Sequence, residues 1–346
     1  MSTYSAFSTS VLVRIGQVTN RTLVLPMLMF FPTSRCNSRC ISCDWWKQSG
    51  EGDLAIEEIA DVARSLPALG TRLVAFSGGE PLLRPDVFEA ASMFRAQGVD
   101  LHLLTSGVLL ERCADSVAEY FTRVTVSLDA TTEELYRAIR GVAALAIVGK
   151  GVERLRRLAP RVSITARATL HRENFRELPR LIDQARAMGF QGISFLAADV
   201  SSTAFGRHAR SERPCLDLDT DEIAEFKSLV ERTIVTHQID FESGFVLDSP
   251  SKLRRLPKYY AALAGQSSFP RNDCNAPWVS VVLEADGDVR PCFFHPAIGN
   301  IRRTPLDEIL GGSLRAFRGS LDMQGNAVCK QCVCSIKAGW RGAPWQ

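Results

Sequence analysis

The sequence predicts an α/β fold, in which a partial (β/α)6 TIM-like barrel is followed by a small domain with a β-hairpin and a helix. Strand-like and helix-like segments alternate with short loops over residues 23–200, and such alternation gives parallel strands joined by right-handed crossovers. The six strands expected there are too few to close an eightfold barrel. With 346 residues, the chain also exceeds one average domain and leaves room for a second, smaller unit.

The expected barrel strands are short apolar runs or alternating segments. They cover residues 27–31, 73–76, 101–104, 124–128, 162–168 and 193–196. The expected helices show a period of 3.6 residues, and two of them end at a glycine. They cover residues 56–66, 85–97 before Gly98, and 174–188 before Gly189.

Beyond residue 200 the alternation stops. A helix is expected at residues 220–237, opened by the cap Asp219-Thr220-Asp221-Glu222, and another at 253–263. Residues 279–283 and 288–290 predict a hairpin that turns at 285–288, and a helix follows at 306–310. The predicted organisation is an N-terminal extension (1–22), a barrel (23–200), a connecting region (201–272) and a small domain (273–346).

Composition excludes several classes of protein. With 46% hydrophobic residues, 23% charged residues and a net charge of +3, the chain has no basic patch that would indicate nucleic acid binding. No basic segment precedes the first apolar run, and that run, residues 23–31, is too short to cross a bilayer. We therefore expect a cytoplasmic protein that does not bind membranes.

The ten cysteines are grouped, which favours metal ligands over a disulfide scaffold. Three lie in residues 36–43 and five in residues 274–334. The remaining two, Cys113 and Cys215, are expected to be small buried apolar side chains.

Polar clusters follow four successive strands of the predicted barrel. The three-cysteine loop follows the first strand, and Ser77-Gly78-Gly79-Glu80-Pro81 follows the second. Thr105-Ser106-Gly107 follows the third, and the fourth ends at Ser127 and Asp129. Since the carboxyl ends of barrel strands carry the chemistry in such folds, we expect these clusters to share one site.

Cys36, Cys40 and Cys43 have the spacing C-x3-C-x2-C. Three thiolates on a four-cornered [4Fe–4S] cluster leave one iron open for a ligand that is not protein. The alternative is a structural zinc ion completed by a distant residue.

These motifs resemble those of the radical S-adenosylmethionine (SAM) superfamily, and the resemblance covers about residues 23–200. It implies that Cys36, Cys40 and Cys43 hold a [4Fe–4S] cluster whose open iron is chelated by SAM. It also implies contacts to SAM. Gly78, Gly79 and Glu80 meet the amino group, Thr105 and Ser106 lie near the ribose, Ser127 and Asp129 serve the ribose or the methionine end, and Arg167 or Arg172 pairs with the carboxylate.

One residue departs from the family pattern. The position before the last cysteine of the loop is usually aromatic and packs beside the adenine, but here it is Ser42. Trp45 or Trp46 is the candidate to supply the missing apolar surface.

The C-terminal cysteines resemble the SPASM/Twitch domains of the same superfamily, over about residues 273–335. Cys274, Gly287 and Cys292 have the spacing C-x12-G-x4-C, and Cys329, Cys332 and Cys334 follow. The resemblance implies one auxiliary [4Fe–4S] cluster on Cys274, Cys292, Cys329 and Cys332, with Cys334 as a replacement ligand or a spare. The same thiols suit a zinc ribbon, which is the alternative.

The resemblance implies an enzyme that reductively cleaves SAM to a 5′-deoxyadenosyl radical, which takes hydrogen from a substrate, while the auxiliary cluster moves electrons. A reductant protein such as flavodoxin or ferredoxin is the implied partner. The favoured substrate is a small polar natural-product intermediate, of amino-sugar, cyclitol or nucleoside type, that undergoes dehydrogenation, decarboxylation or epimerisation. Candidate substrate contacts are Glu242, Asp248, Tyr259 and Tyr260.

Two alternatives stay open. The first is crosslinking or epimerisation of a ribosomally made peptide, which we consider less favoured because about 22 residues precede the first strand, too few for a separate leader-binding domain. The second is a metal-cluster binding module without enzymatic activity.

Overall fold

The protein is described here by a computed structural model that covers residues 6–207, 216–334 and 336–337. A single curved sheet forms its centre, with the strand order β6-β5-β4-β3-β2-β1-β7-β8-β9. Strands β1 to β6 are parallel, as expected for a partial barrel. The strands are β1 (Met27–Phe30), β2 (Leu73–Phe76), β3 (Asp100–Thr105), β4 (Arg123–Ser127), β5 (Ser163–Leu170), β6 (Ile193–Ala197), β7 (Ser280–Leu283), β8 (Asp288–Arg290) and β9 (Gly299–Asn300).

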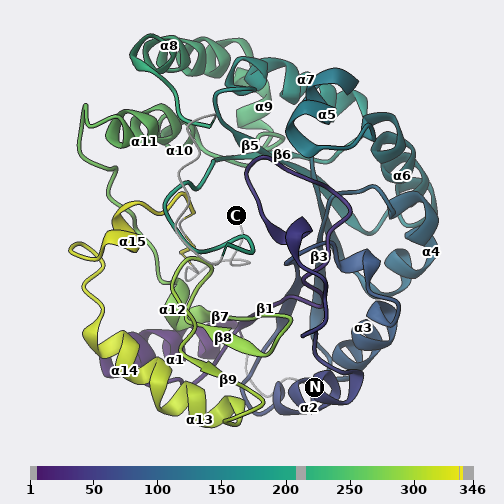
Figure 1. Cartoon of the computed structure of the whole chain (residues 1–346), viewed down its shortest axis with the longest axis vertical. Helices are drawn as coiled ribbons and strands as arrows, with labels where there is room; N and C mark the ends of the chain where they lie inside the picture. Colours follow the sequence, from purple (N-terminus) through teal and green to yellow (C-terminus); the bar gives the residue numbers. More distant parts are fainter. Residues whose placement is uncertain (1–5, 208–215, 335, 338–346) are drawn as a thin grey trace.

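Helices surround this sheet. In Figure 1, the helices α2 to α7 lie along its outer side, and α13 to α15 lie on the other side of the ring. The α-helices are α1 (Ala6–Thr19), α2 (Ile56–Ser65), α3 (Val87–Ala96), α4 (Leu110–Tyr120), α5 (Glu133–Arg140), α6 (Leu145–Leu158), α7 (Leu178–Ala187), α8 (Thr220–Thr236), α9 (Gln238–Glu242), α10 (Pro250–Leu253), α11 (Arg255–Leu263), α12 (Ala276–Val279), α13 (Leu306–Gly311), α14 (Ser313–Ser320) and α15 (Ala327–Lys330). The 3-10 helices are η1 (Trp45–Lys47), η2 (Pro81–Leu83) and η3 (Phe175–Glu177).

The six predicted barrel strands are confirmed, with ends that differ by at most two residues from the expectation. Strand β5 shows why the pattern works, because its residues alternate between buried and exposed or half-buried positions along its length. The expected helix at 174–188 begins as η3 and continues as α7, and the helix expected at 253–263 is divided into α10 and α11.

The hairpin of the small domain is confirmed, but its first strand has an additional role. Strand β7 pairs in parallel with β1, with Phe30 opposite Leu283, and β8 then pairs antiparallel with β7. The C-terminal region therefore extends the barrel sheet at the edge of β1.

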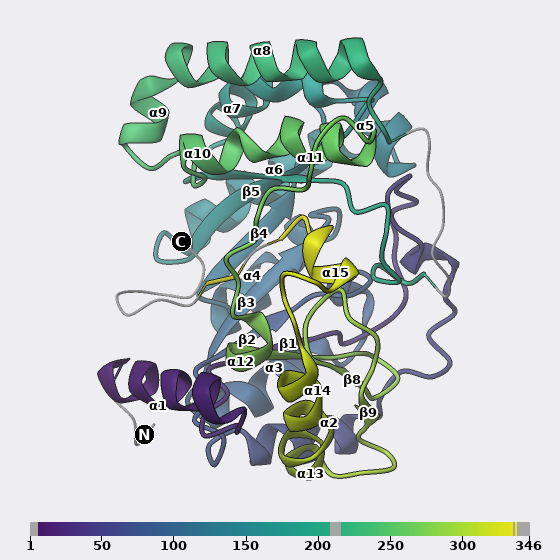
Figure 2. The same ribbon diagram turned by 90° about the vertical axis from the view of Figure 1, so that its left-hand side faces the viewer.

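Aromatic side chains fill the space between the sheet and its outer helices. Phe30, Phe76, Phe94 and Phe121 are at most 2% exposed, and Phe76 packs against each of the others with ring centroids 5.3–5.7 Å apart. Figure 2 shows α8 and α1 at opposite ends of the molecule. Within the described ranges, no helix combines the length and the apolar character needed to cross a membrane.

Candidate functional site

The three-cysteine loop follows β1 and is fixed on both sides by backbone hydrogen bonds. The amide of Glu80 donates to the carbonyl of Arg35 (2.8 Å), which attaches the loop to the end of β2. On the other side, the amide of Arg39 donates to the carbonyl of Arg140 (2.8 Å) at the end of α5. The loop is thus held between two βα connections of the barrel.

Glycines allow this close approach. Gly78 has φ +93°, and a Cβ atom there would lie 2.7 Å from the Cβ of Phe31. A Cβ atom on Gly79 would collide with the carbonyl oxygen of Arg35, which is backbone and has no room to move aside. The two glycines are therefore required for the end of β2 to contact the cysteine loop.

The three thiols are half-buried and near enough to one another for their charges to interact. Burial raises the pKa of Cys36 to about 11, and the nearby charges of Glu80 and Cys40 add to this rise. Burial likewise raises the pKa of Cys43 to about 12, and its neighbours Cys40 and Cys36 contribute. Three half-buried soft donors on one loop fit an iron–sulfur cluster, whose positive iron ions stabilise the thiolate form.

Glu80, Thr105 and Ser106 lie together next to this loop, as the sequence predicts. The Glu80 carboxylate is 1% exposed and accepts hydrogen bonds from the Thr105 hydroxyl (2.8 Å) and the Ser106 amide (2.7 Å). The Ser106 hydroxyl donates to Oδ1 of Asn37 within the cysteine loop (3.2 Å). Glu80 therefore joins the ends of β2 and β3 beside Cys36.

Asp129 also has protein partners on both carboxylate oxygens. It accepts from the guanidinium of Arg140 (2.5 Å) and from the amide of Thr169 (2.8 Å). Arg140 lies near Cys40, where its charge opposes the rise that burial causes in the pKa of that thiol. Ser127, at the end of β4, is half-buried.

The structure separates the two arginines considered for the SAM carboxylate. Arg172 forms ion pairs with Asp219 and Glu222, both at 2.8 Å, at the start of α8. Arg167 is half-buried on β5, and its Nε donates to the Ser194 hydroxyl (3.1 Å). Arg167 keeps its positive charge without an ion-pair partner among the described residues, whereas Arg172 is neutralised by two carboxylates.

The four candidate substrate contacts all have hydrogen-bond partners within the protein. Glu242 is exposed on α9 and accepts from Gln238 one turn earlier (2.6 Å). The buried carboxylate of Asp248 accepts from the amide of Phe195 (2.5 Å) at the edge of β6, and it also pairs with Lys252.

The two tyrosines hold the ends of β5 and β6 in place. The hydroxyl of Tyr260 donates to the carbonyl of Leu170 (2.5 Å) and accepts from the amide of Ala198 (3.0 Å). The hydroxyl of Tyr259 donates to the carbonyl of Ala198 (3.2 Å). Both hydroxyls are thus buried and bonded to backbone, and a substrate role for the two tyrosines stays a prediction.

The loop after β6 contributes residues that sequence reasoning missed. Arg207 and Asp199 form a salt bridge of 2.8 Å with both side chains 1% exposed. The Nη2 group of Arg207 also donates to the carbonyl of Ser42 (2.7 Å), next to Cys43. Arg207 thereby connects the end of β6 to the cysteine loop, and no motif in the sequence marks it.

Aromatic rings cover the loop where Ser42 replaces the usual aromatic residue. Trp45 is buried and contacts the Phe31 ring edge-on, with centroids 5.7 Å apart, whereas Trp46 is 38% exposed. The ring of Phe293 lies 5.5 Å from Phe31 and 5.4 Å from Phe205. Phe293 follows Cys292 directly, so this aromatic cluster lies between the two groups of cysteines.

The five C-terminal cysteines come together around one cavity, and all five line it together with His295. Burial raises the pKa of Cys292 to about 12 and that of Cys329 to about 11, and Cys274 contributes to both. The Nε2 atom of His295 lies 3.3 Å from the sulfur of Cys329. The thiols expected from the spacing are therefore brought together, and as five soft donors they fit a second iron–sulfur cluster. They are Cys274, Cys292, Cys329, Cys332 and Cys334.

Cys334 differs from the other four in its charged surroundings. Burial raises its pKa, and the charges of Arg167 and Lys252 oppose that rise. Cys334 thus lies on the side of the cavity that faces β5 and α10. Cys113, on α4, is half-buried against the main core as expected, and Cys215 lies outside the described residues.

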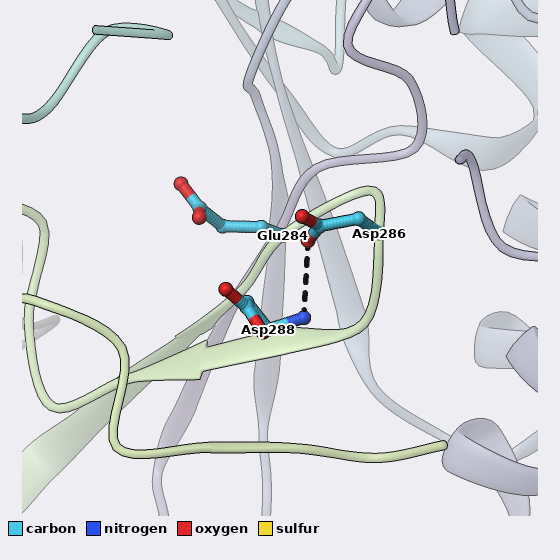
Figure 3. Close-up of side chains that lie close together, drawn as sticks. All are labelled: Glu284, Asp286 and Asp288. Atoms are coloured by element: carbon cyan, nitrogen blue, oxygen red, sulfur yellow. Dashed lines mark hydrogen bonds between the residues drawn. The ribbon is translucent and has the colours of Figure 1, made fainter. Parts of the chain in front are cut away.

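Three carboxylates, Glu284, Asp286 and Asp288, lie close together at the hairpin turn (Figure 3), and each has a hydrogen-bond or ion-pair partner within the protein. Glu284 pairs with Arg290 at 2.9 Å, and Asp286 accepts from the amide of Asp288 (3.1 Å). Asp288 in turn accepts from the side chain of Asn300 (2.9 Å). These contacts stabilise the turn, and we assign no metal ion to it.

Comparisons with known proteins agree with this geometry. Residues 30–185 match the Radical SAM superfamily, and residues 274–333 match SPASM, an iron–sulfur cluster-binding domain. The chain is 26% identical to Fe-coproporphyrin III synthase of Methanosarcina barkeri, over 82% of this chain and 73% of that protein. It is 33% identical to GTP 3′,8-cyclase of Marinobacter nauticus, over 81% of each.

Solved structures show the same fold at low sequence identity. Streptococcus suis SuiB bound to the precursor peptide SuiA has a TM-score of 0.65 and 13% identity, over 96% of this chain and 76% of that one. The histidine-tagged form of anSMEcpe with bound AdoMet has a TM-score of 0.64 and 19% identity, over 89% of this chain and 83% of that one.

Proposed function

Because the chain belongs to the radical SAM superfamily and carries a C-terminal SPASM domain, we propose that it uses SAM to modify a small polar substrate. The observation that carries this proposal is the placement of two groups of half-buried thiols on either side of one aromatic cluster. Phe293 connects them, since it follows Cys292 in the chain and packs against Phe31 at the base of the three-cysteine loop.

When bound, the cluster and SAM supply one-electron chemistry, in which a carbon–sulfur bond of SAM breaks and the resulting 5′-deoxyadenosyl radical takes hydrogen from the substrate. Cys36, Cys40 and Cys43 hold the cluster. The chain's other residues orient SAM and exclude water, and the aromatic rings of Phe31, Phe205 and Phe293 shield the site.

The SAM contacts are proposed from the ends of the strands. Glu80 keeps one acceptor position free on Oε2 after its bond to the Ser106 amide, so it is suited to accept from an amino group. Arg167 is the proposed partner of the SAM carboxylate, since Arg172 is already paired with two carboxylates. The full set is Gly78, Gly79, Glu80, Thr105, Ser106, Ser127, Asp129 and Arg167.

The C-terminal cavity is proposed to hold an auxiliary [4Fe–4S] cluster that moves electrons to or from the active site. Cys274, Cys292, Cys329 and Cys332 are the proposed ligands, and Cys334 is the spare thiol because its surroundings differ. A small reductant protein such as flavodoxin or ferredoxin is the proposed electron donor.

The substrate class is the most specific part of the proposal. The 33% identity to a GTP 3′,8-cyclase over 81% of the chain supports a small polar substrate of nucleoside type. Peptide modification has less support, since the likeness to the peptide-bound SuiB structure, at 13% identity, concerns the fold.

Anaerobic reconstitution followed by iron and sulfide analysis tests the proposal. We expect about eight irons per chain for two cubane clusters, and formation of 5′-deoxyadenosine after reduction with SAM present. Cys36→Ala should remove about four irons and all SAM cleavage, whereas Cys274→Ala should remove about four irons and leave some cleavage. The matched control is Cys113→Ala, which should keep the full iron content. A wild-type protein that loads zinc, or never cleaves SAM, would contradict the proposal.

A further inference from the structure

A second cavity lies between the edge strand of the barrel and the C-terminal cysteines. Three parts of the chain line it. They are Phe195 of β6, then Lys252 of α10 with Arg255 and Tyr259 of α11, and finally Lys330 and Cys332 of the cysteine segment. No residue of the three-cysteine loop lines this cleft, which shares Asn272 and Cys332 with the cavity of the C-terminal cysteines.

The cleft is positively charged. Three of its lining residues, Lys252, Arg255 and Lys330, are cations, and its lining includes no aspartate or glutamate among the described residues. Lys252 pairs at 2.6 Å with Asp248, whose other oxygen accepts from the amide of Phe195. The three cations and this one carboxylate leave an excess of two positive charges, which the thiolate of Cys332 would reduce to one where it holds the auxiliary cluster.

Neither of the other two cations has an anionic partner among the residues that the structure describes. The guanidinium of Arg255 donates to neutral oxygens only, the carbonyl of Arg271 (2.7 Å) and Oδ1 of Asn272 (2.5 Å). Lys330 is exposed on α15, and no ion pair of its ammonium group occurs within the described part of the chain. Two unneutralised cations in one half-enclosed cleft attract an anion.

Arg255 is held in place by the cysteine segment itself. The side-chain amide of Asn272 donates to the carbonyls of Cys329 (2.8 Å) and Cys332 (3.0 Å), while its oxygen accepts from Arg255. The guanidinium therefore has a fixed position relative to the auxiliary cysteines. Its remaining N–H groups are suited to a bidentate contact with a planar or tetrahedral oxyanion.

We propose that this cleft binds a small oxyanion, the carboxylate or phosphate group of the substrate, through Arg255 and Lys330. The proposal rests on the proposed function, which it deepens by giving the substrate an anionic group. The bound anion lies against Cys332, so it positions the substrate beside the auxiliary cysteine segment.

Nuclear relaxation of a simple probe tests the proposal on the reconstituted, dithionite-reduced holoenzyme. A reduced auxiliary cluster is paramagnetic, so inorganic phosphate bound in the cleft should show saturable enhancement of its 31P relaxation. Acetate labelled with 13C, measured in the same way, shows whether a carboxylate is preferred to a phosphate. Saturation by either probe supports the proposal, and no saturable enhancement with either overturns it.

Variants test whether the probe binds in the cleft. Since Lys330 is exposed, Lys330→Gln should preserve the fold and weaken probe binding about fivefold, and Lys330→Glu should weaken it further. Lys227→Gln, on the exposed face of α8, is the matched control and should leave binding unchanged. Equal weakening by the Lys330 and Lys227 variants would overturn the proposal.

SAM cleavage in the same preparations separates the two proposals. Formation of 5′-deoxyadenosine without saturable probe binding overturns the anion cleft and leaves the proposed function intact. Saturable probe binding without SAM cleavage counts against the proposed function, while the cleft itself is retained.

Discussion

Arg207 is expected to be one of the most sensitive positions of the molecule, although it holds neither cluster nor substrate in our assignment. Its guanidinium pairs with Asp199 at 2.8 Å and donates to the Ser42 carbonyl at 2.7 Å. The substitution Arg207→Met keeps an unbranched apolar stem and removes every donor. It leaves the Asp199 carboxylate buried without its charge partner and frees the backbone next to Cys43.

The expected loss is large because both side chains of the pair are only 1% exposed. Removal of one partner of a buried ion pair costs about 3–5 kcal/mol. A domain's total free energy of unfolding is only about 5–15 kcal/mol. By contrast, Arg172→Met breaks ion pairs in which the arginine side chain is 37% exposed, and exposed pairs contribute about 0–1 kcal/mol each.

Anaerobic urea unfolding of the metal-free protein measures both free energies, and iron analysis after reconstitution measures the effect on the cysteine loop. We expect Arg207→Met to lose about 3–5 kcal/mol and part of its iron, with Arg172→Met close to wild type. The double variant Asp199→Leu with Arg207→Met should regain stability, because an apolar pair replaces a buried ionic one. Equal, small losses for the Arg207 and Arg172 variants would refute the reasoning.

Three further predictions concern stability and loading. Gly79→Ala places a Cβ atom on a backbone carbonyl and should prevent iron loading of the three-cysteine loop. The control Gly311→Ala places its Cβ atom in open space and should shift the free energy of unfolding, measured by urea titration, by less than about 1 kcal/mol. Tyr260→Phe should cost about 1–3 kcal/mol in the same assay, and Tyr120→Phe under about 0.5 kcal/mol; the opposite order would contradict the structural role of Tyr260. Burial lowers the pKa of His171 to about 4, below its value of about 6.5 in the unfolded chain. The contribution of this histidine to the free energy of unfolding is therefore fully present above about pH 6.5. It falls towards pH 4 by at most about 1.4 kcal/mol per pH unit. The variant His171→Gln should show a shallower fall, and an unchanged slope would exclude this histidine.

The barrel strands could be predicted because they are short apolar runs or, as in β5, alternate between apolar and polar residues, and both signals are local. The pairing of β7 with β1 could not be predicted, since nothing in residues 280–283 distinguishes a hairpin strand from one that also extends the barrel sheet. Helix α1 was missed because its apolar face is short and weakly marked by charged residues.

The candidate site shows the same division between local and distant signals. Cysteine spacing placed eight cysteines in two groups, seven of which are the proposed ligands, since metal ligands must be close in space. The sequence could not show that Asp248 accepts from the edge of β6, because a buried carboxylate has the same sequence signal whether it serves a ligand or a strand. Arg207 and Asp199 were missed since their partner, the carbonyl of Ser42, is a backbone group 165 residues from Arg207.

Two buried arginine–aspartate pairs hold the three-cysteine loop from different strands. Arg140 and Asp129 connect it to the end of β4, and Arg207 and Asp199 connect it to the end of β6. Buried ion pairs add little stability on balance, because desolvation offsets their attraction. Their effect here is on position, since each arginine also lies near a thiol whose pKa burial has raised and opposes that rise. The two ion pairs therefore fix the position of the loop, and the cost of removing the thiol protons is lowered where the cluster is expected.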